Sequence, residues 1–208
     1  MRGGWLFAAL LLSACGVPRS EAPLIATSES PAELKSGLYA VMVGNSPAEL
    51  AELSAEARSK CIDFGYSETD NDVRRQMVHC PGESDARIDA VAGGYSLSGR
   101  GDEEGGFARF DFRLRRLPGT DFYVVQANEV PPQGYYYPLL RFRDGRAELF
   151  TVPCHDPDMP RRVGVPPLKF KCALTTLAAA ESEFRAEIGR IERGEARFAP
   201  AIFRRIGD

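Results

Sequence analysis

The chain has 208 residues, with 26 basic and 29 acidic side chains and a formal net charge of −3 at pH 7. This length suits one domain built around a single hydrophobic core. The near balance of charges leaves no basic surface of the kind that binds DNA or RNA, so we expect no nucleic-acid partner.

The chain opens on a short apolar run. Residues 5–14 are apolar or small, and they follow the basic residue Arg2. A membrane-spanning helix needs roughly 20 apolar residues, so this run is too short to cross a bilayer. A basic start, a brief apolar core and small residues before a boundary are typical of a secretory signal peptide. We therefore expect residues 1–14 to be a signal peptide.

The boundary carries a more specific motif. The sequence Leu12-Ser13-Ala14-Cys15 resembles the lipobox of bacterial lipoproteins. The resemblance implies that Cys15 is joined to diacylglycerol, becomes the first mature residue and is then acylated, for example with palmitate. Two or three acyl chains anchor a protein almost permanently, because each buried methylene contributes about 0.8 kcal/mol. The expected partner is thus membrane lipid at the cell envelope. Gly16 implies the outer membrane, facing the periplasm, for a Gram-negative source.

The residues after this cysteine are predicted to be a spacer. Residues 16–33 are rich in proline, serine, alanine and glutamate, a composition typical of flexible linkers. We therefore assign residues 15–35 to a lipidated cysteine and a flexible spacer, and residues 36–208 to one globular domain.

The globular domain is predicted to begin with a strand and a helix. Residues 36–44 form a β-branched and aromatic run between polar and glycine residues, which predicts a strand. Ser46, Pro47 and Glu49 then provide a helix cap, a favourable first helical residue and a capping box. We expect a short helix over residues 47–59 that leads into a strand over residues 61–66.

Four further cysteines suggest a disulfide framework. They are Cys61, Cys80, Cys154 and Cys172. An even number of cysteines in an exported chain predicts two disulfides, but the sequence does not choose among three connectivities. We favour neighbouring pairs, 61 with 80 and 154 with 172, since each closes a loop of about 20 residues and would contribute roughly 3 kcal/mol.

A metal site is an alternative use of these cysteines. His79 precedes Cys80 and His155 follows Cys154, so two cysteines and two histidines could in principle bind zinc or copper. Neither half has the closely spaced ligand pairs of structural zinc sites, and adjacent strand residues point to opposite faces. We therefore predict no metal and no cofactor.

Catalytic motifs are incomplete. Residues 94–99 approximate a nucleophile elbow around Ser96, but Ser98 occupies the position of its second glycine. His155 lies beside Asp156 in a proline-rich stretch, without a clear nucleophile. We predict no catalytic residues, and a periplasmic hydrolase is the least favoured function.

The middle of the chain is predicted to be a meander of strands. In residues 107–117, Ala108, Phe110, Phe112 and Leu114 fall on one face and charged residues on the other. Turn signals at residues 118–121 and at Asp144-Gly145 separate strands about ten residues apart, which indicates antiparallel pairing.

The end of the chain is predicted to be helical again. Leu174, Leu177, Phe184, Ile188 and Ile191 form an apolar stripe, so we expect an amphipathic helix over residues 175–193 that ends at Gly194. Residues 198–206 would add a final edge segment or a short turn. The expected fold is α+β: an antiparallel meander, open or curled into a partial barrel, with a short N-terminal helix and this helix packed on the sheet.

Three tyrosines between prolines, in residues 131–138, are candidates for a contact surface, and we single out Tyr135 and Tyr137. The expected function is a membrane-anchored lipoprotein with a non-catalytic binding or assembly role and an envelope protein as partner. The alternative is a lipocalin-like carrier of a small apolar ligand, should the meander enclose a cavity.

Overall fold

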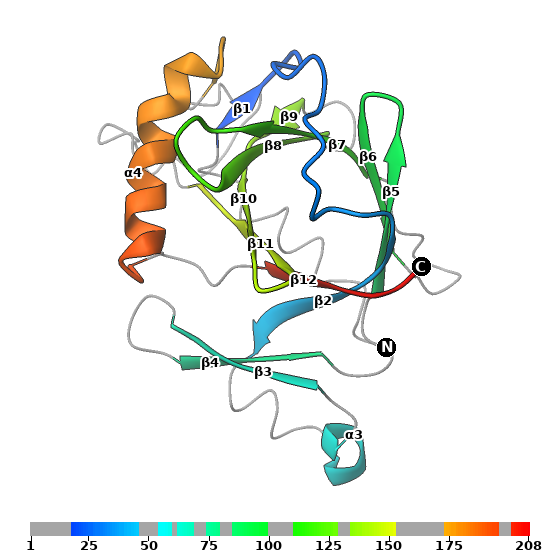
Figure 1. Ribbon diagram of the computed structural model, residues 1–208. Coiled ribbons are helices and arrows are strands. Elements are labelled where there is room, and N and C mark those ends of the chain that lie inside the picture. The colour runs from blue at the N-terminus through cyan, green and yellow to red at the C-terminus, as the bar shows by residue number, and fades with distance from the viewer. Residues whose placement is uncertain are drawn as a thin grey trace, which may run out of the picture.

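The computed structural model describes residues 18–45, 54–59, 62–68, 74–79, 85–99, 110–128, 134–152, 173–195 and 201–208. Most of these residues belong to antiparallel strands, and eight strands close into a barrel (Figure 1). The expected antiparallel, β-rich α+β fold is confirmed. The barrel is closed rather than open or partial.

The eight barrel strands follow one another around the ring in chain order. They are β2 (Gly37–Asn45), β5 (Asp85–Val91), β6 (Gly94–Gly99), β7 (Phe110–Arg116), β8 (Phe122–Asn128), β10 (Leu139–Arg143), β11 (Arg146–Phe150) and β12 (Ala201–Gly207). Each pairs antiparallel with the next, and β12 pairs with β2. The result is an up-and-down barrel.

Strand β12 closes the barrel. Phe203 is the register partner of Val41 in β2 and of Ala147 in β11. The expectation of an edge segment or a turn at residues 198–206 is therefore wrong for the described residues from Ala201 onward, because this strand pairs on both sides. Closure satisfies hydrogen-bonding groups that a sheet edge would leave open.

Alternation along the strands fills the barrel interior. Phe110, Phe112 and Leu114 point inward, as predicted, whereas Asp111 and Arg115 are exposed. The inward residues of the other strands join them, among them Tyr39, Val41, Ala86, Ile88, Tyr95, Leu97, Val125, Ala127, Leu140, Ala147, Ala201 and Phe203. Eight strands give an interior just wide enough to be filled by side chains or to hold one small ligand.

A second apolar cluster lies outside the barrel, under helix α4 (Glu181–Glu192). Phe184, Ile188 and Ile191 pack against residues of β8, β10 and β11, and Leu174 and Leu177 lie against the same cluster. The predicted stripe and its packing on the sheet are confirmed. The α-helix begins later than predicted, after a 3-10 turn (η1, Ala178–Ala180), and its last turn is followed by Gly194 with φ of 73°.

Residues 18–36 are packed on the barrel. Strand β1 (Arg19–Ser20) pairs with β9 (Tyr135–Tyr136), and the backbone N–H groups of Leu24 and Ile25 donate to Gln126 Oε1 at 2.6 and 2.7 Å. In Figure 1 this blue segment then passes in front of the ring of strands to reach β2. Residues 18–35 are therefore not the predicted spacer: Ile25 and Leu34 are buried, and polar partners on the barrel fix the backbone between them.

A hairpin extends from the far end of β2. It consists of β3 (Ile62–Glu68) and β4 (Arg74–His79), and Val43 of β2 is the register partner of Val78. Strand β3 confirms the strand predicted after the first helix. Of that helix, α3 (Ala55–Ser59) is described, and residues 46–53 lie outside the described residues. Across the described ranges, we find no helix with the length and apolar character that a membrane span requires.

Candidate functional site

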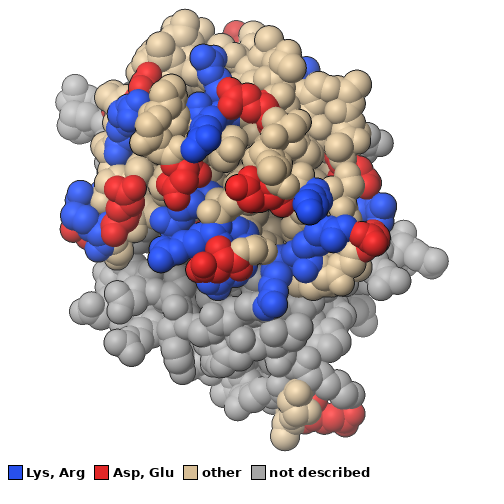
Figure 2. Space-filling model, in the orientation of Figure 1, with Lys and Arg blue, Asp and Glu red and all other residues tan. Residues whose placement is uncertain are grey.

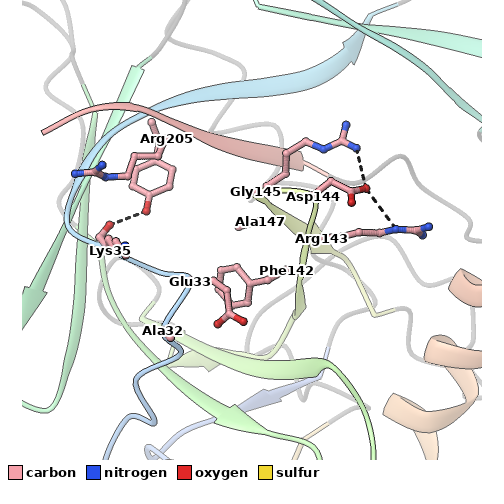
Figure 3. Close-up of a pocket in the computed structure, with 11 residues that line it drawn as sticks. Ala32, Glu33, Lys35, Phe142, Arg143, Asp144, Gly145, Ala147 and Arg205 are labelled. Atoms are coloured by element: carbon pink, nitrogen blue, oxygen red, sulfur yellow. Dashed lines mark hydrogen bonds and ion pairs between the residues drawn. The ribbon is translucent and has the colours of Figure 1, made fainter.

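A cavity of about 620 Å³ opens at the end of the barrel that carries the β10–β11 turn (Figure 3). Three of its lining residues belong to the segment that crosses the barrel, and the others come from β2, β10, β11, β12 and the turn between β10 and β11. They are Ala32, Glu33, Lys35, Tyr39, Phe142, Arg143, Asp144, Gly145, Arg146, Ala147 and Arg205. The cavity is thus lined by four neighbouring barrel strands and the N-terminal segment.

The floor of the cavity is apolar. Tyr39 and Ala147 belong to the barrel core, and Phe142 packs against that core and meets Tyr123 edge-on, with ring centroids 5.7 Å apart. Register explains why these side chains meet, since Phe142 and Ala147 are direct partners in the β10–β11 hairpin. A ligand that reaches the floor would contact aromatic and methyl groups.

Tyr39 supplies a hydroxyl group at the edge of this floor. It donates a hydrogen bond to the Lys35 carbonyl oxygen at 2.6 Å. Burial raises the pKa of Tyr39 above its ordinary value of 10.0, and the nearby Arg205 guanidinium only partly opposes this effect. Tyr39 therefore stays protonated at neutral pH and acts as a hydrogen-bonding group rather than a nucleophile.

The rim of the cavity is charged, with four cationic side chains against two carboxylates. Asp144 forms ion pairs with Arg143 and Arg146, at 3.6 and 3.7 Å from their guanidinium nitrogens, and Figure 3 shows Asp144 beside Arg143. The ammonium group of Lys35 makes no ion pair with another described residue. Figure 2 shows Lys and Arg side chains gathered in a band across this face, with acidic side chains among them. The rim has an excess of positive charge.

A tight turn and a close backbone approach position the residues of the rim. Asp144 and Gly145 have φ of 52° and 72°, the left-handed values of a tight hairpin turn, which the Asp-Gly pair predicted. Gly37 has φ of 148°, and a Cβ atom there would lie 2.4 Å from the Gly207 carbonyl oxygen and 2.7 Å from Arg205 Nε. The entry to β2 therefore needs glycine, because the end of β12 packs directly against it.

Arg205 is held at this junction. Its Nε donates to the Ser36 carbonyl oxygen at 3.1 Å, and its guanidinium group pairs with Asp208. Tyr39 and Arg205 are register partners, so their side chains share the inner face of the sheet. The sequence marked the hairpin turn, but it held no signal that Lys35, Tyr39, Phe142 and Arg205 belong to one site.

The predicted contact tyrosines lie elsewhere. Tyr137 is 0 % exposed, and its hydroxyl is 2.6 Å from that of Ser20, so its assignment to a partner contact is wrong. Tyr135 is half-buried against the cluster under α4, and Tyr136 packs against the barrel core. Residues 18–25 and α4 cover the face that was expected to be free.

The remaining sequence candidates divide into two groups. Ser96 is a buried residue of β6, as an ordinary strand residue would be. Cys15, Cys61, Cys80, Cys154, Cys172 and His155 lie outside the described residues. Among the residues that are described, no three His, Cys, Asp or Glu side chains form a cluster suited to a metal ion.

Comparison of the chain with protein-family models, with curated proteins and with solved structures finds no match in any of the three. The candidate site combines an apolar floor, one protonated hydroxyl group and a rim with excess positive charge.

Proposed function

We propose that this protein is a lipid-anchored, non-catalytic binding protein of the bacterial envelope, and that the barrel mouth holds a small amphipathic molecule. The observation that carries this proposal is the cavity of about 620 Å³ above the apolar floor. Ligand pockets commonly measure about 300–1,000 Å³ and combine apolar walls with a few polar groups.

The distribution of charge indicates which amphipathic molecules fit. The apolar body would lie against Phe142 and Ala147, and a charged group would lie at the rim. Because cationic side chains outnumber carboxylates there, an anionic group is favoured over a cationic one. Lys35 is the best placed cation, since no described residue neutralises it.

A small ligand is favoured over a docked protein. A protein-binding surface of the kind expected from the sequence would present an aromatic patch. Within the described ranges Ile206 is the one large hydrophobic side chain that is clearly exposed, at 48 %. The aromatic residues expected at such a surface pack inside the barrel or under α4.

The binding proposal is tested with two fluorescent probes that share one aromatic body. N-phenyl-1-naphthylamine is neutral, and 1-anilinonaphthalene-8-sulfonate adds a sulfonate. We expect both probes to bind the mature protein. Ala32→Phe, an exposed lining position, should weaken both at least tenfold, whereas the same change at Ala92, exposed in the β5–β6 turn, should not. Equal binding to both variants would place the probes outside this cavity.

The charge preference is tested at the rim. Lys35→Gln should weaken binding of the sulfonate probe about threefold, the effect of one exposed charge, and leave the neutral probe unchanged. Arg115→Gln, an exposed change in β7 away from the cavity lining, is the control. If Lys35→Gln affects both probes equally, the rim does not select anions.

The anchor is tested separately. The motif at residues 12–15 supports acylation of Cys15. Cells supplied with radioactive palmitate should label the normal protein and not Cys15→Ser. Unchanged labelling of the variant would reject the anchor without bearing on the cavity.

A further inference from the structure

The barrel holds the chain firmly three residues after Cys15. Pro18 is buried, and its carbonyl oxygen accepts a hydrogen bond from the backbone N–H of Tyr137 at 3.2 Å. The Arg19 carbonyl oxygen accepts one from the Leu174 N–H at 2.6 Å. The backbone of Ser20 approaches β9 so closely that a Cβ atom at Gly134 would lie 2.4 Å from the Ser20 carbonyl oxygen.

This attachment limits the distance between an acylated Cys15 and the barrel. Three residues, even fully extended, span about 11 Å. A flexible linker of twenty residues, which the composition predicted, would instead give a typical separation of about 25 Å. The barrel surface around Pro18 is therefore held close to the depth at which the acyl chains enter the bilayer.

The surface beside Pro18 is free of charge over two stretches. An isolated bridge joins Arg19 to Ala173, so residues 173–180 lie next to the attachment point. These eight residues include no Asp, Glu, Lys or Arg, and residues 22–25 include none either. The exposed members are small: Ala22, Pro23, Ala173, Thr175, Thr176, Ala178 and Ala179. Charged residues make up 26 % of the chain, so their absence from these two stretches is unusual for its surface.

We propose that this neutral surface, residues 22–23 together with 173–179, lies on the lipid bilayer that holds the acyl chains of Cys15. The inference rests on the anchor in the proposed function. The exposed side chains of these two stretches carry no charge, so their contact with the interface costs little hydration free energy, and the exposed Glu21 precedes the first stretch. The short tether keeps the surface and the bilayer at a high effective concentration, and weak contact is then enough.

Tryptophan fluorescence can report this contact with the bilayer. Its single tryptophan is Trp5, within the predicted signal peptide, so the mature chain has none. A tryptophan placed at Ala179 would report the proposed surface. The same substitution at Ala92, in the β5–β6 turn on the opposite side of the barrel from α4, is the matched control (Figure 1). Thr175→Trp gives a second reporter should the first variant fold poorly.

The acylated protein would be reconstituted in phosphatidylcholine vesicles, with part of the lipid brominated on its acyl chains to quench nearby tryptophan. We expect the Ala179→Trp and Thr175→Trp emission to be quenched at least threefold more than that of Ala92→Trp. Equal emission from all three variants, in protein that floats with the vesicles, would overturn the docking surface and leave the anchor standing. Protein that does not float with the vesicles would overturn both.

Discussion

The hydroxyl groups of Tyr137 and Ser20 lie 2.6 Å apart although 117 positions separate them in the sequence. The Ser20 hydroxyl also donates to the Ala22 carbonyl oxygen, and the Tyr137 hydroxyl also donates to Gln126 Oε1 at 3.4 Å. The contact is buried and fixes β1 on the outer face of the barrel. It joins the segment that leads from the predicted anchor to the strands that carry the candidate site.

Removal of this hydroxyl tests the attachment. Tyr137→Phe keeps the ring in its pocket and removes the buried hydrogen bonds of the hydroxyl with Ser20 and Gln126, so the free energy of unfolding should fall by at least about 1 kcal/mol. Urea denaturation measures this as a lower midpoint with an unchanged slope. Tyr135→Phe, at the half-buried neighbour, should have no comparable effect. Equal midpoints for the two variants would contradict the role of the Ser20–Tyr137 bond.

The same glycine-to-alanine change should have opposite effects at two positions. Gly145 has φ of 72° with open space around it, so alanine there strains the backbone and should cost about 1 kcal/mol. Gly189 lies in α4, where a Cβ atom would meet only the flexible end of Arg193, and alanine should stabilise the protein by about 0.5–1 kcal/mol. Thermal unfolding of both variants checks the signs. A stabilised Gly145→Ala protein would contradict the turn geometry.

A largely buried ion pair in the β10–β11 hairpin should contribute far more to stability than the exposed charges at its turn. The Arg141 Nε and Nη2 atoms donate to Glu148 Oε2 at 2.9 and 2.6 Å, and the guanidinium carbon lies 5.2 and 5.3 Å from the ring centroids of Phe122 and Phe150. Arg141→Ala leaves a buried carboxylate without its partner and should cost about 3 kcal/mol. Arg143→Ala, at an exposed arginine of the same strand, should cost less than about 0.5 kcal/mol. Chemical denaturation of the two variants would measure the difference.

Stability should decline at alkaline pH. Burial raises the pKa of Tyr39, and likewise of Tyr123 and Tyr137, above the ordinary value of 10.0. The folded protein therefore holds these phenolic protons more tightly than the unfolded chain. This contribution to stability is complete below pH 10 and is lost as the pH rises through the folded pKa values.

Urea denaturation at a series of pH values, with tyrosine ionisation followed by absorbance, checks this decline. The loss of stability should coincide with ionisation and should be less steep in Tyr39→Phe. A free energy of unfolding that stays constant well above pH 10 would show that these hydroxyl groups ionise without penalty in the fold.

The disulfide predicted between Cys61 and Cys80 stays a prediction, since both cysteines lie outside the described residues. Ile62 of β3 and His79 of β4 are direct partners, and Cys61 and Cys80 are their outer neighbours in the sequence. A disulfide between Cys61 and Cys80 would close a loop of about 20 residues. We expect mass spectrometry of a non-reduced digest to recover a peptide linking Cys61 to Cys80. A link between Cys61 and Cys154 or Cys172 would refute the pairing.

Local patterns in the sequence determined most elements of the fold. Alternation placed Phe110, Phe112 and Leu114 on one face, and the Asp144-Gly145 pair fixed the hairpin between β10 and β11. The stripe from Leu174 to Ile191 fixed the packed face of α4. These features depend on residues at most a few positions apart, because side-chain direction repeats every 2 residues in a strand and every 3.6 in a helix.

Barrel closure, the covered N-terminal segment and the cavity were decided only by the tertiary structure. Closure pairs Phe203 with Val41, and the cavity combines Lys35 and Tyr39 with Phe142 and Arg205. The composition of residues 18–35 predicted a flexible linker. In the fold, two buried apolar residues and hydrogen bonds to Gln126 and Leu114 hold this segment on the barrel. The alternation of residues in a strand indicates which face is buried. It does not indicate which distant segment covers that face, because contacts between residues far apart in the sequence leave no local signal.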